Sequence, residues 1–453
     1  MTHPDAAERL LSQASQFSDR RIRLGLGRMR RLLNELGNPE HALDAIHVAG
    51  TNGKGSTVAF LEAMLRQANY ETGVYTSPHL QRFNERIRHR GRAIDDASLE
   101  LLLTTVLQIN AGQPATFFEL TTAVALLHFS RLQPPSPPGT RWHACQRYAA
   151  ILETGLGGRL DATNVVQPRL VLLTPVGLDH QEYLGDTLTR IAREKAGILK
   201  PGVPAVADPG SAMAAEVILK RAEHLGAPLW LRQRDYRFDL PDGSGLWHYQ
   251  DSLGSLALPP PRLLGRHQYG NAALALAGLR LLSTQLTCPW HLSNAAMQEG
   301  VAQAWLPGRL ECFPGTPPIW LDGAHNLPGA QVLAAALADM EPMPTHLIFS
   351  ALRDKDMAGM AKILAPSIDR VWIAPLAEQR AADPQRMAQV WQQQGLATTL
   401  AADPASALHE ARKLSPPHGR ILVCGSLHLV GSVRDILSPP SNSRSRWMRG
   451  DNE

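Results

Sequence analysis

Short apolar runs alternate with helix-period segments along nearly the whole chain, and this alternation constrains the fold more than any other feature. Strands are predicted at 45–50, 72–77, 149–155, 170–176, 204–208 and 228–231. Helices are predicted at 54–69, 98–110, 117–131, 187–197, 212–225 and 269–283. Strands that alternate with helices build βαβ units, which join into a mostly parallel sheet. The predicted fold class is therefore α/β.

A second alternation begins near Leu306 and predicts a smaller, Rossmann-like doubly wound domain. Its strands are expected at the start of 318–326 and at 346–352, 370–376 and 420–426. Two segments interrupt the pattern: a turn-rich stretch near 236–260 predicts a small antiparallel excursion, and the Pro-rich 133–140 predicts a surface loop or insertion. We therefore predict an N-terminal parallel-sheet domain over 1–304, a C-terminal Rossmann-like domain over 305–437 and a disordered tail over 438–453.

Length and composition limit the classes of protein. The 453 residues exceed what one hydrophobic core usually serves. A net charge of only +4, spread along the chain, does not favour a nucleic-acid partner. Since no apolar run approaches the roughly 18 residues of a membrane span and the N-terminus lacks a signal-peptide pattern, we expect a cytoplasmic protein with no membrane partner. The cysteines form no CxxC pair and are expected to be reduced: Cys145, Cys288, Cys312 and Cys424.

The stretch HVAGTNGKGST (His47 to Thr57) places three glycines, a lysine and hydroxyl residues directly after a strand-like run. Backbone N–H groups of such a loop can surround phosphate oxygens, and the start of the next helix adds its positive dipole end. Lys54 supplies a cation, and Ser56 or Thr57 can reach a phosphate or a metal-bound water. The loop departs from the ordinary pattern, because Val48 replaces a glycine and Gly55 follows the lysine. The sequence favours a P-loop-type ATPase domain over a Gly-rich turn with a solvated lysine.

Polar residues also follow other predicted strands of the first domain. Glu153 ends an apolar strand, and a carboxylate beside a phosphate loop is a natural Mg²⁺ ligand. Ser77 follows the second strand, although a Ser-Pro pair more often marks a turn. Taken alone, His180 would usually be structural, and Lys195 would usually be a surface lysine.

In the second domain, Asp322 ends the strand of the LDGAHN stretch. Its carboxylate can accept a hydrogen bond from a ribose hydroxyl or an attacking amine, although helix capping by Asp322 or Asn326 is a common alternative. Arg309 lies at the predicted domain junction. It could move onto a γ-phosphate when the domains close, or it could be a salt-bridged linker arginine.

These motifs together resemble the folylpolyglutamate synthase/dihydrofolate synthase family, within the wider Mur ligase superfamily. The stretches GTNGKGS, TSPHL, ETGLGGRLDATN, LDH, EKAGI, GRHQ…N and DGAHN occur in the order and spacing of the family, over nearly the whole chain. The resemblance implies an ATP-dependent ligase that adds L-glutamate through an acyl phosphate. With dihydropteroate the product is dihydrofolate, and with a reduced folate the product is a folylpoly-γ-glutamate. We expect a bifunctional enzyme.

The resemblance also assigns roles to residues. The ATP-binding residues it implies are Thr51, Asn52, Gly53, Lys54, Gly55, Ser56, Thr57, Asn271, Arg309, Asp322 and His325. The pterin-binding residues it implies are Leu24, Gly25, Leu26, Gly27, Arg28, Phe117, Phe118, Glu119, Thr121, Leu160, Asp161 and Ala162. Ser77, Glu153, His180 and Lys195 resemble ligands of two Mg²⁺ ions, with Lys195 carboxylated by CO₂. Lys54, Lys195, His180, Arg309 and Asp322 are the expected catalytic residues.

Other interpretations remain open. A monofunctional folylpolyglutamate synthase keeps most of the same motifs. A ligase for a cell-wall precursor would need a uridine-nucleotide domain ahead of residue 50. A non-catalytic nucleotide-binding module explains the loop but not the other motifs, and a simple P-loop hydrolase would release phosphate without glutamate. The expected partners are small molecules only, namely ATP, L-glutamate, 7,8-dihydropteroate and reduced folates, and the family is typically monomeric.

Overall fold

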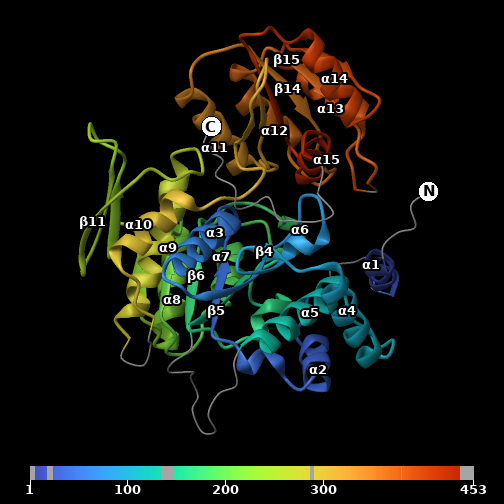
Figure 1. Cartoon of the computed structure of the whole chain (residues 1–453). Coiled ribbons are helices and arrows are strands. Elements are labelled where there is room, and N and C mark those ends of the chain that lie inside the picture. The colour runs from blue at the N-terminus through green and yellow to red at the C-terminus, as the bar shows by residue number, and fades with distance from the viewer. Residues whose placement is uncertain (1–5, 18–23, 134–146, 286–289, 379, 439–453) are drawn as a thin grey trace.

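The computed structural model describes residues 6–17, 24–133, 147–285, 290–378 and 380–438, and Figure 1 shows their arrangement. An eight-stranded sheet has the spatial order β4-β3-β2-β5-β1-β6-β7-β8. Its strands are β1 (Ala45–Ala49), β2 (Glu71–Tyr75), β3 (Ile87–His89), β4 (Arg92–Ala93), β5 (Tyr148–Glu153), β6 (Leu170–Leu173), β7 (Ala205–Ala207) and β8 (Leu229–Leu231). From β2 to β8 every neighbouring pair is parallel, whereas β3 and β4 are antiparallel additions at one edge. The predicted parallel sheet is therefore confirmed.

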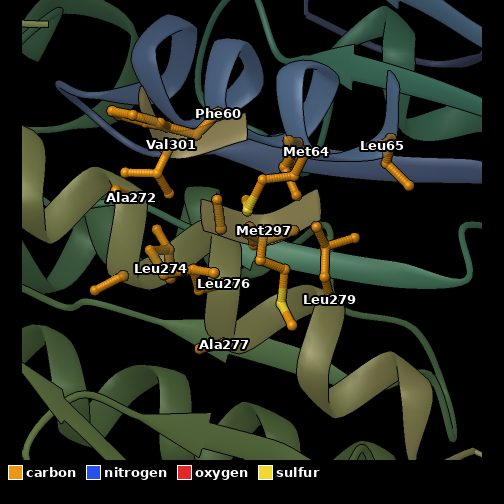
Figure 2. Close-up of a cluster of buried hydrophobic side chains, with 14 of the residues drawn as sticks. Phe60, Met64, Leu65, Ala272, Leu274, Leu276, Ala277, Leu279, Met297 and Val301 are labelled. Carbon is orange, nitrogen blue, oxygen red and sulfur yellow. The ribbon is translucent and has the colours of Figure 1, made fainter. Parts of the chain in front are cut away.

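Helices cover both faces of this sheet, because successive side chains of a strand point to opposite faces. On one face, Ile46 and Val48 of β1 pack with three helices: α3 (Lys54–Gln67), α9 (His267–Ser283) and α10 (Asn294–Gln303). Figure 2 shows side chains of these three helices in the same cluster. On the other face, Ala45 packs with α1 (Ala6–Phe17), α2 (Gly27–Glu35), α4 (Asp96–Asn110) and α5 (Phe117–Leu132). Further along that face, Ala49 packs in a cluster with α8 (Ala212–Leu225), which contacts α7 (Leu188–Ala196). The central strands are fully buried, as expected for a covered parallel sheet.

A separate antiparallel sheet lies where the sequence predicts an antiparallel excursion. It has the order β11-β10-β9, formed by β9 (Tyr236–Asp239), β10 (Trp247–Asp251) and β11 (Gly254–Leu258). Arg280 of α9 holds Asp251 through two hydrogen bonds of 2.6 and 2.8 Å, and both side chains are nearly buried. We call the eight- and three-stranded sheets with their helices the larger unit.

A six-stranded sheet forms the core of the smaller unit, at the top of Figure 1. Its order is β12-β13-β17-β14-β15-β16, and only β12 runs antiparallel to its neighbour. The strands are β12 (Glu311–Phe313), β13 (Ile319–Leu321), β14 (Thr345–Phe349), β15 (Arg370–Ile373), β16 (Ala397–Leu400) and β17 (Arg420–Cys424). The helices are α11 (Leu327–Asp339), α12 (Met357–Leu364), α13 (Pro384–Gln392), α14 (Pro404–Leu414) and α15 (Leu427–Leu437). Helices α11 to α13 pack on one face and α14 and α15 on the other, which confirms the doubly wound class.

The remaining elements are short. They are the single-turn helix α6 (Gln181–Leu184) and the 3₁₀ helices Pro39–Ala42, Phe83–Arg86, Ala162–Val165 and Ala365–Ser367. Four strands, β3, β4, β12 and β16, were not predicted from the sequence. They have two to four residues and lie at or next to sheet edges, so their apolar pattern is short or weak.

The strands of the larger unit lie within 45–258 and those of the smaller unit within 311–424, on either side of the predicted division at 304/305. The domain bounds themselves stay a prediction, and residues 134–140 and 439–453 of the predicted insertion and tail lie outside the described residues. The units touch where the segment after β2 meets α15. Leu80 packs against a core cluster of the smaller unit, and Gln81 Nε2 donates to Asp435 Oδ1 at 2.7 Å.

Candidate active site

A cavity of about 930 Å³ lies between the two units, and both contribute its walls. The larger unit contributes loops that follow β1, β2, β5 and β6, and the smaller unit contributes segments that follow β13, β14 and β17. The carboxyl ends of parallel strands are where α/β proteins usually bind ligands, and the order β5-β1-β6 places a topological switch point at β1. The cavity is therefore positioned by the topology of both sheets.

The glycine-rich loop joins β1 to α3 along the cavity wall. Gly50 and Gly53 have φ angles of +153° and +85°, which L-residues rarely adopt. A Cβ atom at Gly53 would collide with the Oδ1 atom of Asn271, and one at Gly50 would collide with Thr174. These glycines are thus required by backbone conformation and by close packing. Lys54 begins α3, so the positive end of the helix dipole faces the loop.

Two lysines converge on the loop from different parts of the chain. Lys54 Nζ donates to the carbonyl oxygens of Gly50 at 3.2 Å and Thr51 at 3.0 Å. Lys195 Nζ, from α7, donates to the same Gly50 oxygen at 2.6 Å. Lys195 is buried, and its burial together with the charge of Lys54 lowers its pKa to about 7. A substantial fraction of this amine is therefore neutral near neutral pH.

Glu153 and Ser77 lie beside Lys54. Glu153 is buried at the end of β5, with Oε1 4.0 Å from Lys54 Nζ, and Oε2 accepts a 3.4 Å hydrogen bond from the Ser77 backbone N–H. Burial raises the pKa of Glu153, while Lys54, the Ser77 N–H and Arg309 act to lower it. A buried carboxyl group, with Lys54, Arg309 and Ser77 nearby, is thus brought next to the phosphate-type loop.

His180 follows β6 on the same side of the cavity. It adopts a left-handed conformation with φ +50°, which is uncommon for a residue with a side chain. Burial lowers its pKa to about 4, and the attraction of Asp179 only partly opposes this shift. The imidazole is therefore neutral at physiological pH and keeps a lone pair that can bind a metal.

The other end of the cavity is lined by aromatic and apolar side chains with two carboxylates. Its predicted members are Leu24, Phe117, Phe118, Glu119, Leu160, Asp161 and Ala162. Glu119 forms a 2.9 Å ion pair with Arg28 and accepts from the Thr116 N–H at 2.7 Å. Asp161 accepts from the N–H groups of Leu156 at 2.8 Å and Thr163 at 3.0 Å. We call this part of the cavity the acceptor end, and the part around the glycine-rich loop the phosphate end.

Several predicted residues do not line the cavity. Thr57 is fully buried within α3, and Thr121 is fully buried with its hydroxyl 3.3 Å from that of Tyr75. The others outside the lining are Gly25, Leu26, Gly27 and Arg28, although Arg28 reaches the site indirectly through Glu119. The remaining predicted site residues all lie in the cavity wall.

The smaller unit contributes Arg309, Asp322 and His325 to the wall. Asp322 accepts from the backbone N–H groups of Leu310 at 2.9 Å and Ala324 at 2.8 Å, so it organises both segments. Burial raises the pKa of Asp322 and Arg309 acts to lower it. His325 Nδ1 lies 2.7 Å from the Gly323 carbonyl, to which it must donate, and so Nε2 carries the lone pair.

Comparisons with known proteins agree with this architecture. Residues 308–427 match the family described as "Mur ligase, glutamate ligase domain". A dihydrofolate synthase/folylpolyglutamate synthase of Bacillus subtilis is 36% identical over 434 residues, covering 92% of this chain and 95% of the relative. The solved structure of Escherichia coli FolC in complex with DHPP and ADP has a TM-score of 0.85 and 32% identity, covering 96% of this chain and 99% of that one.

The chain belongs to the dihydrofolate synthase/folylpolyglutamate synthase family. A solved bifunctional member with Mn, AMPPNP and L-glutamate bound has a TM-score of 0.81 and 33% identity, covering 96% of this chain and 99% of that one. The predicted family, fold class and enzyme class, an ATP-dependent ligase, are therefore confirmed. None of the helices in the described ranges is long and apolar enough to span a membrane.

The residues present fit divalent metal ions of the kind that accompany nucleotides. Among the described residues, no group of three His, Cys, Asp or Glu side chains could hold a metal ion. The predicted ligands near the phosphate loop are instead the Glu153 carboxyl group, the Ser77 hydroxyl and the neutral His180 imidazole. Mg²⁺ commonly takes only one or two carboxylates from the protein and completes its shell with phosphate oxygens and waters. A metal that arrives with a nucleotide suits this donor set.

The structure adds cavity residues that the sequence did not single out as site residues. Asp179 accepts hydrogen bonds from Lys355 Nζ at 2.7 Å and Asn326 Nδ2 at 2.8 Å, and so joins the larger unit to the smaller one. Burial would raise the pKa of Asp179, but His180, Lys355 and Asn326 outweigh burial and hold it low. Arg86 also lines the cavity, and its Nε donates to His79 at 2.9 Å. For Lys355, the only sequence signal was a charged RDKDM stretch directly after a predicted strand.

Proposed function

We propose that the chain adds L-glutamate both to dihydropteroate, giving 7,8-dihydrofolate, and to reduced folates, giving folylpoly-γ-glutamates. The observation that carries this proposal is one continuous cavity with a phosphate end and an acceptor end, lined by both units. ATP, an aromatic carboxylic acid and an amino acid can meet there away from bulk water. The relative with bound Mn, AMPPNP and L-glutamate and the relative with bound DHPP and ADP support this choice of substrates.

The phosphate end holds ATP in this proposal. Backbone N–H groups of residues 51–56 and the start of α3 surround the β- and γ-phosphates, and Lys54 moves from the loop carbonyls onto the phosphate oxygens. Asn271 lies against the loop, within reach of the nucleoside. From the smaller unit, Arg309 stabilises charge on the transferring phosphoryl group, while Asp322 and His325 contact the nucleotide.

Ser77, Glu153, His180 and a carboxylated Lys195 would hold two Mg²⁺ ions. When bound, these ions would neutralise charge on the phosphate oxygens and orient the γ-phosphoryl group. Support for carboxylation comes from the buried, partly neutral Lys195 amine, since only an uncharged amine attacks CO₂. The carbamate would turn a cation into an oxygen ligand, which Mg²⁺ prefers.

The acceptor end holds the pterin ring. Phe117 and Phe118 offer faces for a flat heterocycle, and Glu119 and Asp161 offer acceptors for its N–H groups. Leu24, Leu160 and Ala162 complete an apolar wall. The same wall serves dihydropteroate and a reduced folate, because the two share the pterin end and differ at the carboxylate that reacts.

The reaction then follows the geometry of the cavity. The acceptor's carboxylate attacks the γ-phosphorus of ATP, which gives an acyl phosphate and ADP. The amine of L-glutamate attacks the acyl carbon, and a tetrahedral intermediate collapses to the amide and inorganic phosphate. The contacts of Asp179 with Lys355 and Asn326 keep the units together, which excludes water that would hydrolyse the acyl phosphate.

ADP release with ATP, Mg²⁺ and L-glutamate tests the proposal, with 7,8-dihydropteroate and a tetrahydrofolate compared as acceptors. Glutamate-dependent release with both supports a bifunctional synthase. Release with the folate alone would make the chain a monofunctional folylpolyglutamate synthase. Phosphate release that is independent of glutamate would contradict ligation and favour a hydrolase. The monomeric state and the cytoplasmic location stay predictions.

A further inference from the structure

His47 is a polar residue in the middle of the most central strand of the larger sheet. It pairs in register with Leu152 of β5 and Val171 of β6, and its side chain is fully buried. Strands covered on both faces are normally apolar throughout. Burying an imidazole is costly unless it is hydrogen-bonded, so packing alone does not account for a histidine here.

A chain of hydrogen bonds connects His47 to the wall of the cavity. His47 Nε2 lies 2.8 Å from Thr163 Oγ1, and Thr163 Oγ1 donates to Asp161 Oδ1 at 2.5 Å. A hydroxyl has one proton, and the proton of Thr163 is directed to the carboxylate. His47 must therefore donate its Nε2–H to Thr163. Burial and the nearby charge of Lys200 lower the pKa of His47 to about 3, so the ring is neutral.

The other ring nitrogen of His47, Nδ1, is not used in the relay. Among the described residues, no group hydrogen-bonds His47 Nδ1, which is buried. Within the described part of the chain, the single hydrogen bond of this imidazole is thus the one directed through Thr163 toward Asp161. His47 therefore supplies a hydrogen-bond donor of fixed direction, because a neutral ring with a proton on Nε2 can only donate from that atom to Thr163.

We propose that His47 and Thr163 are positioning residues for the acceptor end: His47 orients the Thr163 hydroxyl, which in turn holds the Asp161 carboxylate in the direction of the acceptor. This inference rests on the proposed function, in which Asp161 accepts from the pterin ring. The relay reaches Asp161 from behind the cavity wall, and neither His47 nor Thr163 lines the cavity.

The position of His47 allows a positioning role at the acceptor end to be distinguished from a general structural role in β1. His47 lies three residues before Gly50 on the strand that carries the glycine-rich loop, so a distorted β1 would disturb the phosphate end. Loss of the relay alone would weaken only the acceptor end. The KM for the acceptor and the KM for ATP therefore distinguish the two roles.

Thr163→Val and Thr163→Ser form the matched pair for the test, because valine preserves the shape without the hydroxyl and serine keeps the hydroxyl. His47→Leu removes the ring donor, and His47→Gln keeps an N–H donor. Steady-state ADP release is measured for each variant with 7,8-dihydropteroate, L-glutamate and ATP varied in turn. Thermal unfolding of each variant identifies any that fail to fold.

We expect Thr163→Val and His47→Leu each to raise the KM for dihydropteroate about tenfold, which matches loss of one hydrogen bond to a charged group. The KM for ATP stays within about twofold of wild type, because the side-chain hydrogen bonds of the relay join His47, Thr163 and Asp161 and, among the described residues, none of them reaches the glycine-rich loop. Thr163→Ser and His47→Gln restore most of the affinity. The double variant His47→Leu/Thr163→Val is no worse than Thr163→Val alone, since both act through the same hydroxyl.

Four outcomes would overturn the inference. The first is an equal rise of KM for ATP and for dihydropteroate, and the second is additive effects in the double variant. The third is a Thr163→Ser variant as impaired as Thr163→Val, and the fourth is an unchanged KM for dihydropteroate in an active Thr163→Val variant. A wild-type protein without glutamate-dependent ADP release would overturn the proposed function, and this inference with it. The outcomes above, seen with an active wild-type protein, would overturn this inference alone.

Discussion

The two ends of the cavity are held by different kinds of hydrogen bond. At the phosphate end, Lys54 and Lys195 donate to the backbone oxygen of Gly50. At the acceptor end, Glu119 and Asp161 already accept from Arg28 and from backbone N–H groups. A lysine ammonium that donates to a neutral carbonyl can leave it and donate to a phosphate instead, because a charged acceptor forms the stronger hydrogen bond. A carboxylate that accepts from several donors is fixed in direction. The lysines of the phosphate end can therefore change their hydrogen-bond partners, whereas the carboxylates of the acceptor end keep a fixed orientation.

Removing the cation of the phosphate end should have the largest effect. Lys54→Ala should reduce glutamate-dependent ADP release by at least about 10³-fold, because charge on the transferring phosphoryl group loses a stabilising cation. The fold should survive because, among the described residues, the Lys54 ammonium donates only to loop carbonyls and lies 4.0 Å from Glu153. Lys220→Ala, which removes an exposed pair with Glu216, is the control and should keep full activity. Normal turnover in Lys54→Ala would contradict the assignment of the loop.

Lys195 of the phosphate end differs from the groups of the acceptor end because only its neutral amine can form a carbamate. Its folded pKa of about 7 lies below the ordinary 10.5, so the reactive neutral amine increases as pH rises through about 7. Carbamate formation should follow the same rise, where an ordinary lysine would require pH above about 10. A ¹³C-bicarbonate NMR signal that grows over this range and is absent from Lys195→Ala is the expected result. Lys195→Ala should lose on the order of 100-fold in activity, since the proposed metal loses a ligand.

A wild-type protein without the carbamate signal, together with full activity in CO₂-depleted buffer, would show that Lys195 acts as an amine.

Gly53→Ala tests how closely the loop is packed. The substitution places a side chain at φ +85°, which costs about 1–3 kcal/mol of folding free energy, and it also collides with Asn271. Gly112→Ala is the matched control, because Gly112 has φ +74° and no atom within 4 Å of an added Cβ. The melting temperature should fall in both variants, but only Gly53→Ala should raise the KM for ATP. Equal kinetics in the two variants would mean that the contact with Asn271 has no role in nucleotide binding.

Arg28→Ala should have the smallest effect, confined to the acceptor end. Glu119 would lose its 2.9 Å ion pair and keep only the hydrogen bond from the Thr116 N–H to hold its direction, so the KM for dihydropteroate should rise about tenfold with the KM for ATP unchanged. Arg30→Ala is the control, since Arg30 is an exposed residue of the same helix. A rise in the KM for ATP in Arg28→Ala would show that the two ends are coupled more tightly than their separate hydrogen bonds suggest.

Sequence patterns predicted the architecture well where the signal is local. The fully buried runs of β1 and β5 and the periodic helix α8 were located within a few residues, because burial on both faces leaves an apolar run and helical packing leaves a regular period. Edge strands such as β16 were missed, since half-exposed residues carry little pattern. The glycine-rich loop was recognisable because its groups are consecutive in the chain.

The amino-acid sequence by itself determined the α/β class, the family and the phosphate loop, all of which depend on neighbouring residues or on a fixed order of motifs. Only the tertiary structure decided that Lys195 and Lys54 share one carbonyl, that Asp179 pairs with Lys355, and that Thr57 and Thr121 do not line the cavity. The physical reason is tertiary packing: the sheet order β5-β1-β6 and the contact between the two units bring together segments that are distant along the chain. The direction of a side chain and its hydrogen-bond partners follow from that packing, and they cannot be read from the sequence.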